Sequence, residues 1–140
     1  MKNIVYQSTS VKLMNDEQLI EILEVARKNN TERNVTGVLL YSEGTFLQVL
    51  EGENDDVDYI FSKLELDPRH KNLITLIDEA IKSKAFGEWS MGFATARPDK
   101  TAELIGYLRS LEKLEAKNGD SAAITTLKTF IDSNKLAISY

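Results

Sequence analysis

The sequence contains no cysteine and a single histidine. Without cysteine the protein has no disulfides, thiolate nucleophiles or cysteine metal sites, and one histidine argues against a metal cluster. No apolar stretch is long enough to span a bilayer, and no signal-peptide hydrophobic region follows Met1. These absences argue against a membrane role and favour a cytoplasmic protein.

Positive charge is also scarce, because 17 Lys and Arg stand against 22 Asp and Glu, for a net charge of -5. The basic residues form no dense block of the kind that phosphate recognition needs, so nucleic acid is not an expected partner. With 42% hydrophobic and 28% charged residues, the 140-residue chain is typical of a globular domain with room for a small appendage.

Periodicity predicts the elements of this domain, since strands alternate apolar residues and helices repeat them every three or four positions. Asn15 and Gln18 have the spacing of a capping box, and Arg27-Lys28 suits a helix C-terminus. Asn54 is the expected cap of a second helix, which Asp67-Pro68 stops. The expected strands are 2–9, 35–41, 45–51, 73–81 and roughly 89–95.

The order β-α-β-β-α-β with one extra strand is that of the ferredoxin-like α+β fold, whose two helices cover one face of the sheet. The run 45–51 is apolar on both faces, so the other face also needs a cover. Helical patterns after Arg97-Pro98 predict a C-terminal helical pair, and this pair or a subunit partner would provide that cover. We therefore expect a main domain over 1–97 and a C-terminal helical extension over 98–140.

Two amides and one phenol fall on the buried sides of these elements. Strand alternation turns Gln48 and Tyr6 inward, and the helical stripe through Ala26 reaches Asn30 four residues later. An unpaired buried amide costs on the order of 1–3 kcal/mol, so each amide requires a partner. Taken alone, the three residues are a core aromatic, a core amide bonded to backbone and a helix C-cap amide.

Six motifs occur in a fixed order along the chain. They are Tyr6-x-Ser8, Arg27-Lys28-Asn29-Asn30, Val35-Thr36-Gly37-Val38-Leu39-Leu40-Tyr41, Phe46-Leu47-Gln48-Val49-Leu50-Glu51-Gly52, Asp67-Pro68-Arg69-His70 and Trp89-Ser90-Met91-Gly92-Phe93. In this order and spacing the sequence resembles the BLUF family, the blue-light sensors using FAD. One departure is Gly87, where the family often has proline.

The resemblance implies that residues 1–97 form a photosensor domain that binds oxidised FAD non-covalently between its two helices. The flavin contacts that it implies are Tyr6, Ser8, Asn29, Asn30, Gln48, Arg69 and His70. Asn30 would hold the pyrimidine edge of the ring, and Gln48 would bridge that edge to Tyr6. Arg69 and His70 would lie near a ring carbonyl or the phosphates. The residues leave the choice between FAD and FMN open.

The implied photochemistry moves an electron and then a proton from Tyr6 to the excited flavin through Gln48. Their return would leave Gln48 rotated or tautomerised. A rearranged hydrogen bond is worth only about 0.5–1.5 kcal/mol net, so the signal has to act on a balanced element. The expected relay is the strand with Trp89 and Met91, which leads into the C-terminal helices.

Three classes of function fit such a domain to different degrees. A short stand-alone sensor would signal through a homo-oligomer or a downstream protein partner. An enzyme is not expected, because the sequence has no Ser/His/Asp set and no phosphate-cradling glycine loop. The alternative is a cofactor-free ferredoxin-like interaction domain, which would be colourless and folded without flavin.

Overall fold

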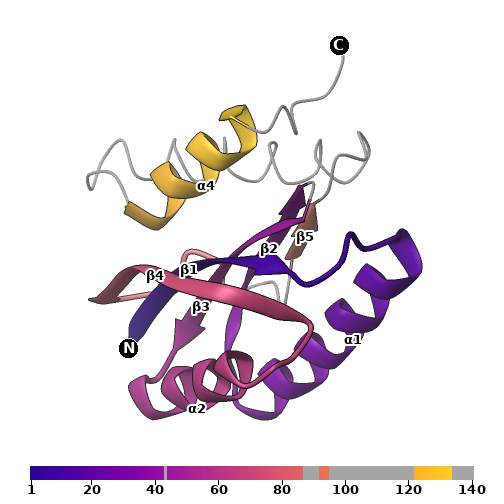
Figure 1. Cartoon of the computed structure of the whole chain (residues 1–140). Helices are drawn as coiled ribbons and strands as arrows, with labels where there is room; N and C mark the ends of the chain where they lie inside the picture. The colour runs from indigo at the N-terminus through magenta and orange to yellow at the C-terminus, as the bar shows by residue number, and fades with distance from the viewer. Residues whose placement is uncertain (43, 87–91, 95–121, 134–140) are drawn as a thin grey trace.

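The computed structural model describes residues 1–42, 44–86, 92–94 and 122–133. Its elements follow the predicted order, with a further helix toward the C-terminus (Figure 1). Their bounds are β1 Lys2–Ser10, α1 Asp16–Glu32, β2 Thr36–Ser42, β3 Thr45–Gly52, α2 Asn54–Glu65, β4 His70–Ala80, β5 Gly92–Ala94 and α4 Ala122–Ser133. This order confirms the ferredoxin-like arrangement with an extra strand.

The strands form one sheet in the order β4-β1-β3-β2-β5. β1 lies antiparallel between β3 and β4, β2 is antiparallel to β3, and the extra strand β5 is parallel to β2. The register places Tyr6 opposite Gln48, and Gln48 opposite Leu39. Residues that lie directly opposite one another project to the same face, so these three form one row across the centre of the sheet.

The face that carries this row is covered by α1 and α2, which lie on the same side of the sheet in Figure 1. Both helices present apolar side chains three or four residues apart, as an amphipathic helix over a core does. The core on this face includes Ile4, Tyr6, Leu39, Leu50, Leu19, Leu23, Val57 and Ile60. The prediction that both helices cover one face is confirmed.

The opposite face is covered by α4, which lies across the sheet from α1 and α2 (Figure 1). The core between α4 and the sheet contains Val5, Val38, Leu40, Leu47, Val49, Phe86, Ala123, Leu127 and Phe130. α4 corresponds to the second helix of the predicted C-terminal pair, and its position explains why β3 is apolar on both faces. The first helix of that pair, expected after residue 101, lies outside the described residues.

The ends of the two N-terminal helices test the capping predictions. The capping box of Asn15 and Gln18 is present, with both side chains bonded to the backbone of the other residue. The expected end near Lys28 is wrong, because α1 continues to Glu32 and has no basic residue in its last turn. The cap at Asn54 is also wrong. Glu53 is the N-cap and makes no side-chain cap hydrogen bond, while acidic residues in the first turn of α2 suit the helix dipole.

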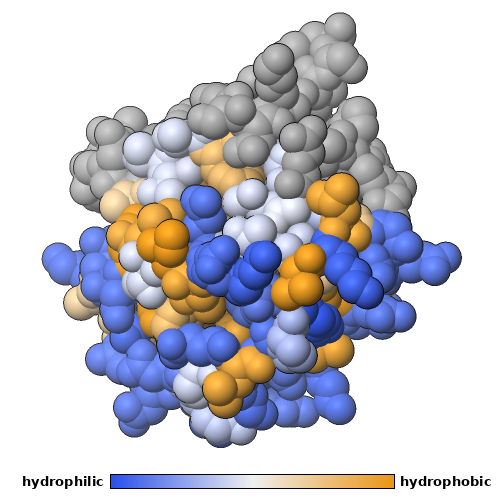
Figure 2. All heavy atoms as spheres, viewed as in Figure 1, coloured by the Kyte–Doolittle hydropathy of each residue, from blue (hydrophilic) through white to orange (hydrophobic). Residues whose placement is uncertain are grey.

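The surface is mainly hydrophilic in the view of Figure 2, with separate apolar groups between charged side chains. The most exposed of the large apolar residues is Leu66, followed by Leu13. Single exposed apolar residues of this kind are normal for a globular domain. Within the part of the chain that the structure describes, no helix is long and apolar enough to cross a membrane.

Leu127 tests whether α4 is an integral part of the fold, since its side chain is fully buried against the sheet. We expect Leu127→Ala to lower the free energy of unfolding by roughly 2–5 kcal/mol, because the change removes apolar contact and leaves a cavity. Thr129→Ala is the matched control on the exposed side of the same helix and should change stability little. Urea unfolding measures both. Equal stability of the two variants would contradict the packing of α4.

Candidate functional site

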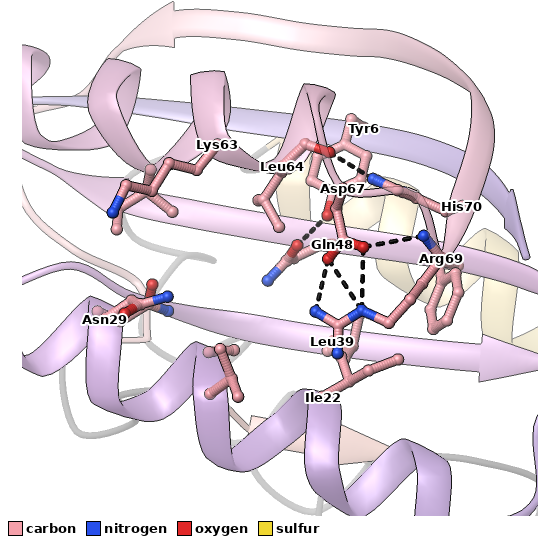
Figure 3. Close-up of a pocket in the computed structure, with 15 residues that line it drawn as sticks. Tyr6, Ile22, Asn29, Leu39, Gln48, Lys63, Leu64, Asp67, Arg69 and His70 are labelled. Atoms are coloured by element: carbon pink, nitrogen blue, oxygen red, sulfur yellow. Dashed lines mark hydrogen bonds and ion pairs between the residues drawn. The ribbon is translucent and has the colours of Figure 1, made fainter.

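A cavity opens between α1 and α2, directly over the central strands of the sheet (Figure 3). Its walls are largely apolar and include Ile22, Ala26, Leu39, Ile60 and Leu64. Polar groups enter it from the sheet, from the last turns of both helices and from the segment that follows α2. An apolar slot with a few converging polar groups is the usual form of a small-molecule site.

Tyr6 and Gln48 form the polar floor of this cavity. They lie opposite one another on β1 and β3, and the Tyr6 hydroxyl donates a hydrogen bond to Gln48 Oε1 (Figure 3). Both side chains are almost fully buried, with 2% and 3% of their surface exposed. Burial, together with the negative charge of Asp67, raises the pKa of the Tyr6 phenol. Tyr6 is therefore a neutral O–H donor at physiological pH.

The Tyr6 ring is held by aromatic neighbours on one side of the cavity. Its centroid lies 5.7 Å from that of Phe61 and 6.2 Å from that of His70, in both cases edge to face. His70 Nε2 lies 2.5 Å from the Leu64 carbonyl, and Nδ1 lies 2.8 Å from Ser8 Oγ. A carbonyl can only accept, so Nε2 carries a proton, and in the neutral imidazole Nδ1 accepts from the Ser8 hydroxyl. This pair of bonds fixes the plane of the imidazole.

Asn29 and Asn30 enter the cavity from the last turn of α1. The residue Asn30 is 1% exposed. Its backbone carbonyl accepts the N–H groups of Arg33 and Val35 at 3.1 and 2.8 Å, at the C-terminal end of the helix. Asn29 lies across the cavity from Lys63 of α2 (Figure 3). Each amide offers two donors and an acceptor, so the pair can recognise a ligand edge that presents both kinds of group.

Charged groups lie at the rim. Arg69 binds Asp67 through its side chain and its backbone N–H, with Nε to Oδ1 and N to Oδ1 both at 2.9 Å. Burial would raise the pKa of Asp67, but the hydrogen bonds from Arg69 outweigh it and the net shift is downward. Asp67 thus remains ionised and tethers Arg69 beside the cavity. Lys63 supplies a second positive charge at the rim.

Six of the seven predicted contacts line this one cavity, namely Tyr6, Asn29, Asn30, Gln48, Arg69 and His70. The seventh residue, Ser8, does not line the cavity, but its hydroxyl forms a hydrogen bond with His70 Nδ1. The predicted relay residues Trp89 and Met91 lie outside the described residues. Sequence reasoning missed Lys63 as a lining residue, although its helical spacing from Ile60 was a usable signal. Among the residues described, no cluster of His, Asp and Glu could hold a metal ion.

Comparison with known sequences gives matches over this same region. The model of a family described as BLUF, sensors of blue-light using FAD, matches residues 1–92. The alpha subunit of the photoactivated adenylate cyclase of Euglena gracilis is 39% identical over 84 residues, which are 60% of this chain. The matched segment is only 8% of that subunit, so most of the relative has no counterpart here.

Solved structures give similar results. The BlsA ground state has a TM-score of 0.67 at 26% identity, over 99% of this chain and 90% of the BlsA chain. Klebsiella pneumoniae BlrP1, with FMN and cyclic diGMP, has a TM-score of 0.67 at 27% identity, over 77% of this chain and 29% of its own. The similarity thus covers a small part of the cyclase subunit and of BlrP1, but 90% of the BlsA chain.

The ionisation of the tyrosines tests the electrostatics of the cavity. Tyr59 lies outside it on α2, where a hydrogen bond from Lys63, with Arg33 nearby, lowers the phenol pKa. We expect Tyr59 to ionise before Tyr6 in an alkaline titration that is followed by phenolate absorbance. Tyr59→Phe should remove a phase below the ordinary tyrosine pKa, and Tyr6→Phe a phase above it.

The same shift has a consequence for stability. Because the pKa of Tyr6 is raised in the folded protein, ionisation favours unfolding. The stabilising contribution of the neutral phenol should be lost as the pH rises above about 10, the ordinary tyrosine pKa. Tyr6→Phe should flatten this part of the stability curve. A Tyr6 phenol that titrates at its ordinary pKa would contradict the burial described above.

Proposed function

The chain belongs to the BLUF family, the sensors of blue light using FAD, and from this premise we propose that it is a blue-light photoreceptor that binds FAD non-covalently between α1 and α2. The observation that carries the proposal is the buried hydrogen bond from Tyr6 to Gln48 at the floor of the cavity. This bond joins an oxidisable phenol to an amide that has both a donor and an acceptor. Both groups lie on the wall of the cavity that a bound ring would face.

The residues of the cavity fit a flavin. Ile22 and Leu64 are among the apolar side chains that would contact the faces of a flat ring. Asn30 and Gln48 would meet its pyrimidine edge, where donors and acceptors alternate, because an amide side chain offers both. Lys63 at the rim would favour the phosphates of the tail. FMN carries the same ring, so the choice of FAD rests on the family description.

When bound, the oxidised flavin supplies the absorption of blue light and an acceptor for one electron. Tyr6 would give up that electron, and its phenolic proton would pass to Gln48 Oε1 while the amide nitrogen releases a proton toward the ring. On recombination the electron and a proton return to Tyr6. Gln48 would then remain rotated or tautomerised, with its donor and acceptor ends exchanged relative to Tyr6.

The output of such a sensor would pass through protein contacts. We propose a cytoplasmic signalling protein without enzymatic activity of its own, which acts through a homo-oligomer or a downstream partner. Residues 1–97 would be the sensor and 98–140 the output segment, with Trp89 and Met91 as the relay between them. α4 supports this division, because it packs on the face of the sheet opposite the cavity.

Gln48→Leu tests the mechanism. The variant should remain yellow, because the other cavity residues still hold the flavin, but it should lose the light-induced red shift. Tyr6→Phe should behave in the same way, since it removes the phenolic proton. The measurement is the visible absorption spectrum of the purified protein in the dark and directly after blue light.

Gln7→Leu is the matched control, because Gln7 is the same residue type on β1, exposed and on the opposite face of the sheet. It should keep both the colour and the shift. A normal shift in Gln48→Leu would refute the proposed role of Gln48. A colourless wild-type protein that stays folded would favour the cofactor-free interaction domain instead.

A further inference from the structure

Glu51 is a buried carboxylate that the proposed photochemistry does not use. It lies on β3 three residues after Gln48 and is 2% exposed. The alternation of the strand turns it to the opposite face of the sheet, the face that α4 covers. Burial raises the pKa of Glu51, while hydrogen bonds from two backbone N–H groups and the charge of Lys84 act against that rise. A buried carboxylate lowers the stability of the fold unless hydrogen bonds or an opposite charge compensate it.

Both oxygens of Glu51 hold the same short segment. Oε2 accepts the backbone N–H of Ala85 at 2.7 Å, and Oε1 accepts that of Phe86 at 2.7 Å. Lys84 fixes the residue before them, because its ammonium donates to the Asn34 carbonyl at 2.6 Å, just ahead of β2. A carboxylate has two acceptor oxygens, so it can accept from two consecutive backbone N–H groups. A side-chain amide has only one acceptor oxygen and cannot replace it in this way.

The neighbours of Glu51 across the strands take no part in this arrangement. Asn3 of β1 and Thr36 of β2 lie directly opposite Glu51 on either side. Within the described residues, the buried Asn3 Oδ1 and Thr36 Oγ1 atoms have no hydrogen-bond partner. The Thr36 hydroxyl could donate to the carboxylate but does not, whereas Asn3 Oδ1 can only accept. The carboxylate thus bonds to Ala85 and Phe86 and not to its row in the sheet. This selectivity indicates that holding the segment is its role.

The held segment leads toward β5. Phe86 is fully buried among Val38, Leu40 and the residues of α4, and β5 begins six residues later at Gly92. β5 pairs with β2, where Leu39 lies between Phe93 on one side and Gln48 on the other. The 84–86 segment thus lies shortly before a strand that is two strands away from Gln48 in the sheet.

We propose that Glu51 is a positioning residue of the sensor, whose carboxylate couples β3 to the chain that enters β5. This inference rests on the proposed function. When the hydrogen bonds of Gln48 change, a displacement of β3 would reach Ala85 and Phe86 through the two bonds of the carboxylate. Phe86 would then carry the displacement into the core beneath α4.

Amide hydrogen exchange at Ala85 and Phe86 tests the proposal in the wild-type protein, in the dark and under blue light. We expect exchange of these amides to become several-fold faster in light. In Glu51→Gln the amide can accept only one of the two N–H groups, so dark exchange should already be faster, on the order of 10-fold. Its flavin should still show the red shift, but the difference in exchange between dark and light should disappear.

Thr36→Val is the matched control, since it changes a buried residue in the same row without touching the carboxylate. It should keep the wild-type exchange in the dark and in the light. A red shift in the wild type without any change in exchange at Ala85 and Phe86 would overturn the role of Glu51 alone, even if Glu51→Gln fails to fold. A light-dependent change that persists in Glu51→Gln would overturn it as well. A wild type that binds no flavin would instead overturn the proposed function.

Discussion

The pairing of β1 with β3 determines the chemistry of this molecule, because it puts Tyr6 opposite Gln48. β3 is apolar on both faces, so a slip of one residue would still bury its apolar side chains. Polar residues remove that ambiguity. A slip would move Gln48 under α4 and Glu51 under α1 and α2, where each would lose its partner. The buried polar groups thus select the register that the hydrophobic pattern leaves open.

Close backbone contact gives a second constraint on the same register. A Cβ atom on Gly37 would lie 1.8 Å from the Val49 carbonyl oxygen, so β2 can approach β3 in this way only with glycine at position 37. Gly44 provides the turn between the two strands with a φ of 87°. The position of Leu39 beside Gln48, and of β5 beyond it, depends on both glycines.

Local periodicity accounts for what the sequence could predict. The inward direction of Tyr6 and Gln48 follows from strand alternation, and that of Asn30 follows from helical spacing, so none of them needs the tertiary fold. The bond between Ser8 and His70 joins residues 62 positions apart, and the clamp by Glu51 spans 35. No local pattern can predict such contacts. The true end of α1 was missed as well, since the helix continues past Arg27 and Lys28 to Glu32 and has no basic residue in its last turn.

The cavity lies on one face of the sheet and the contacts of Glu51 lie on the other, and β3 contributes a residue to each. On one face α1 and α2 leave a cavity above Gln48. A change in the orientation of the Gln48 amide therefore alters its hydrogen bonds but displaces few neighbouring atoms. On the other face Glu51 bonds to Phe86, which lies in a close-packed core with α4 where small displacements are not absorbed. A bond worth about 0.5–1.5 kcal/mol can move little by itself. It has the best chance of a distant effect where the same strand continues into a close-packed core, and β3 provides that connection within three residues.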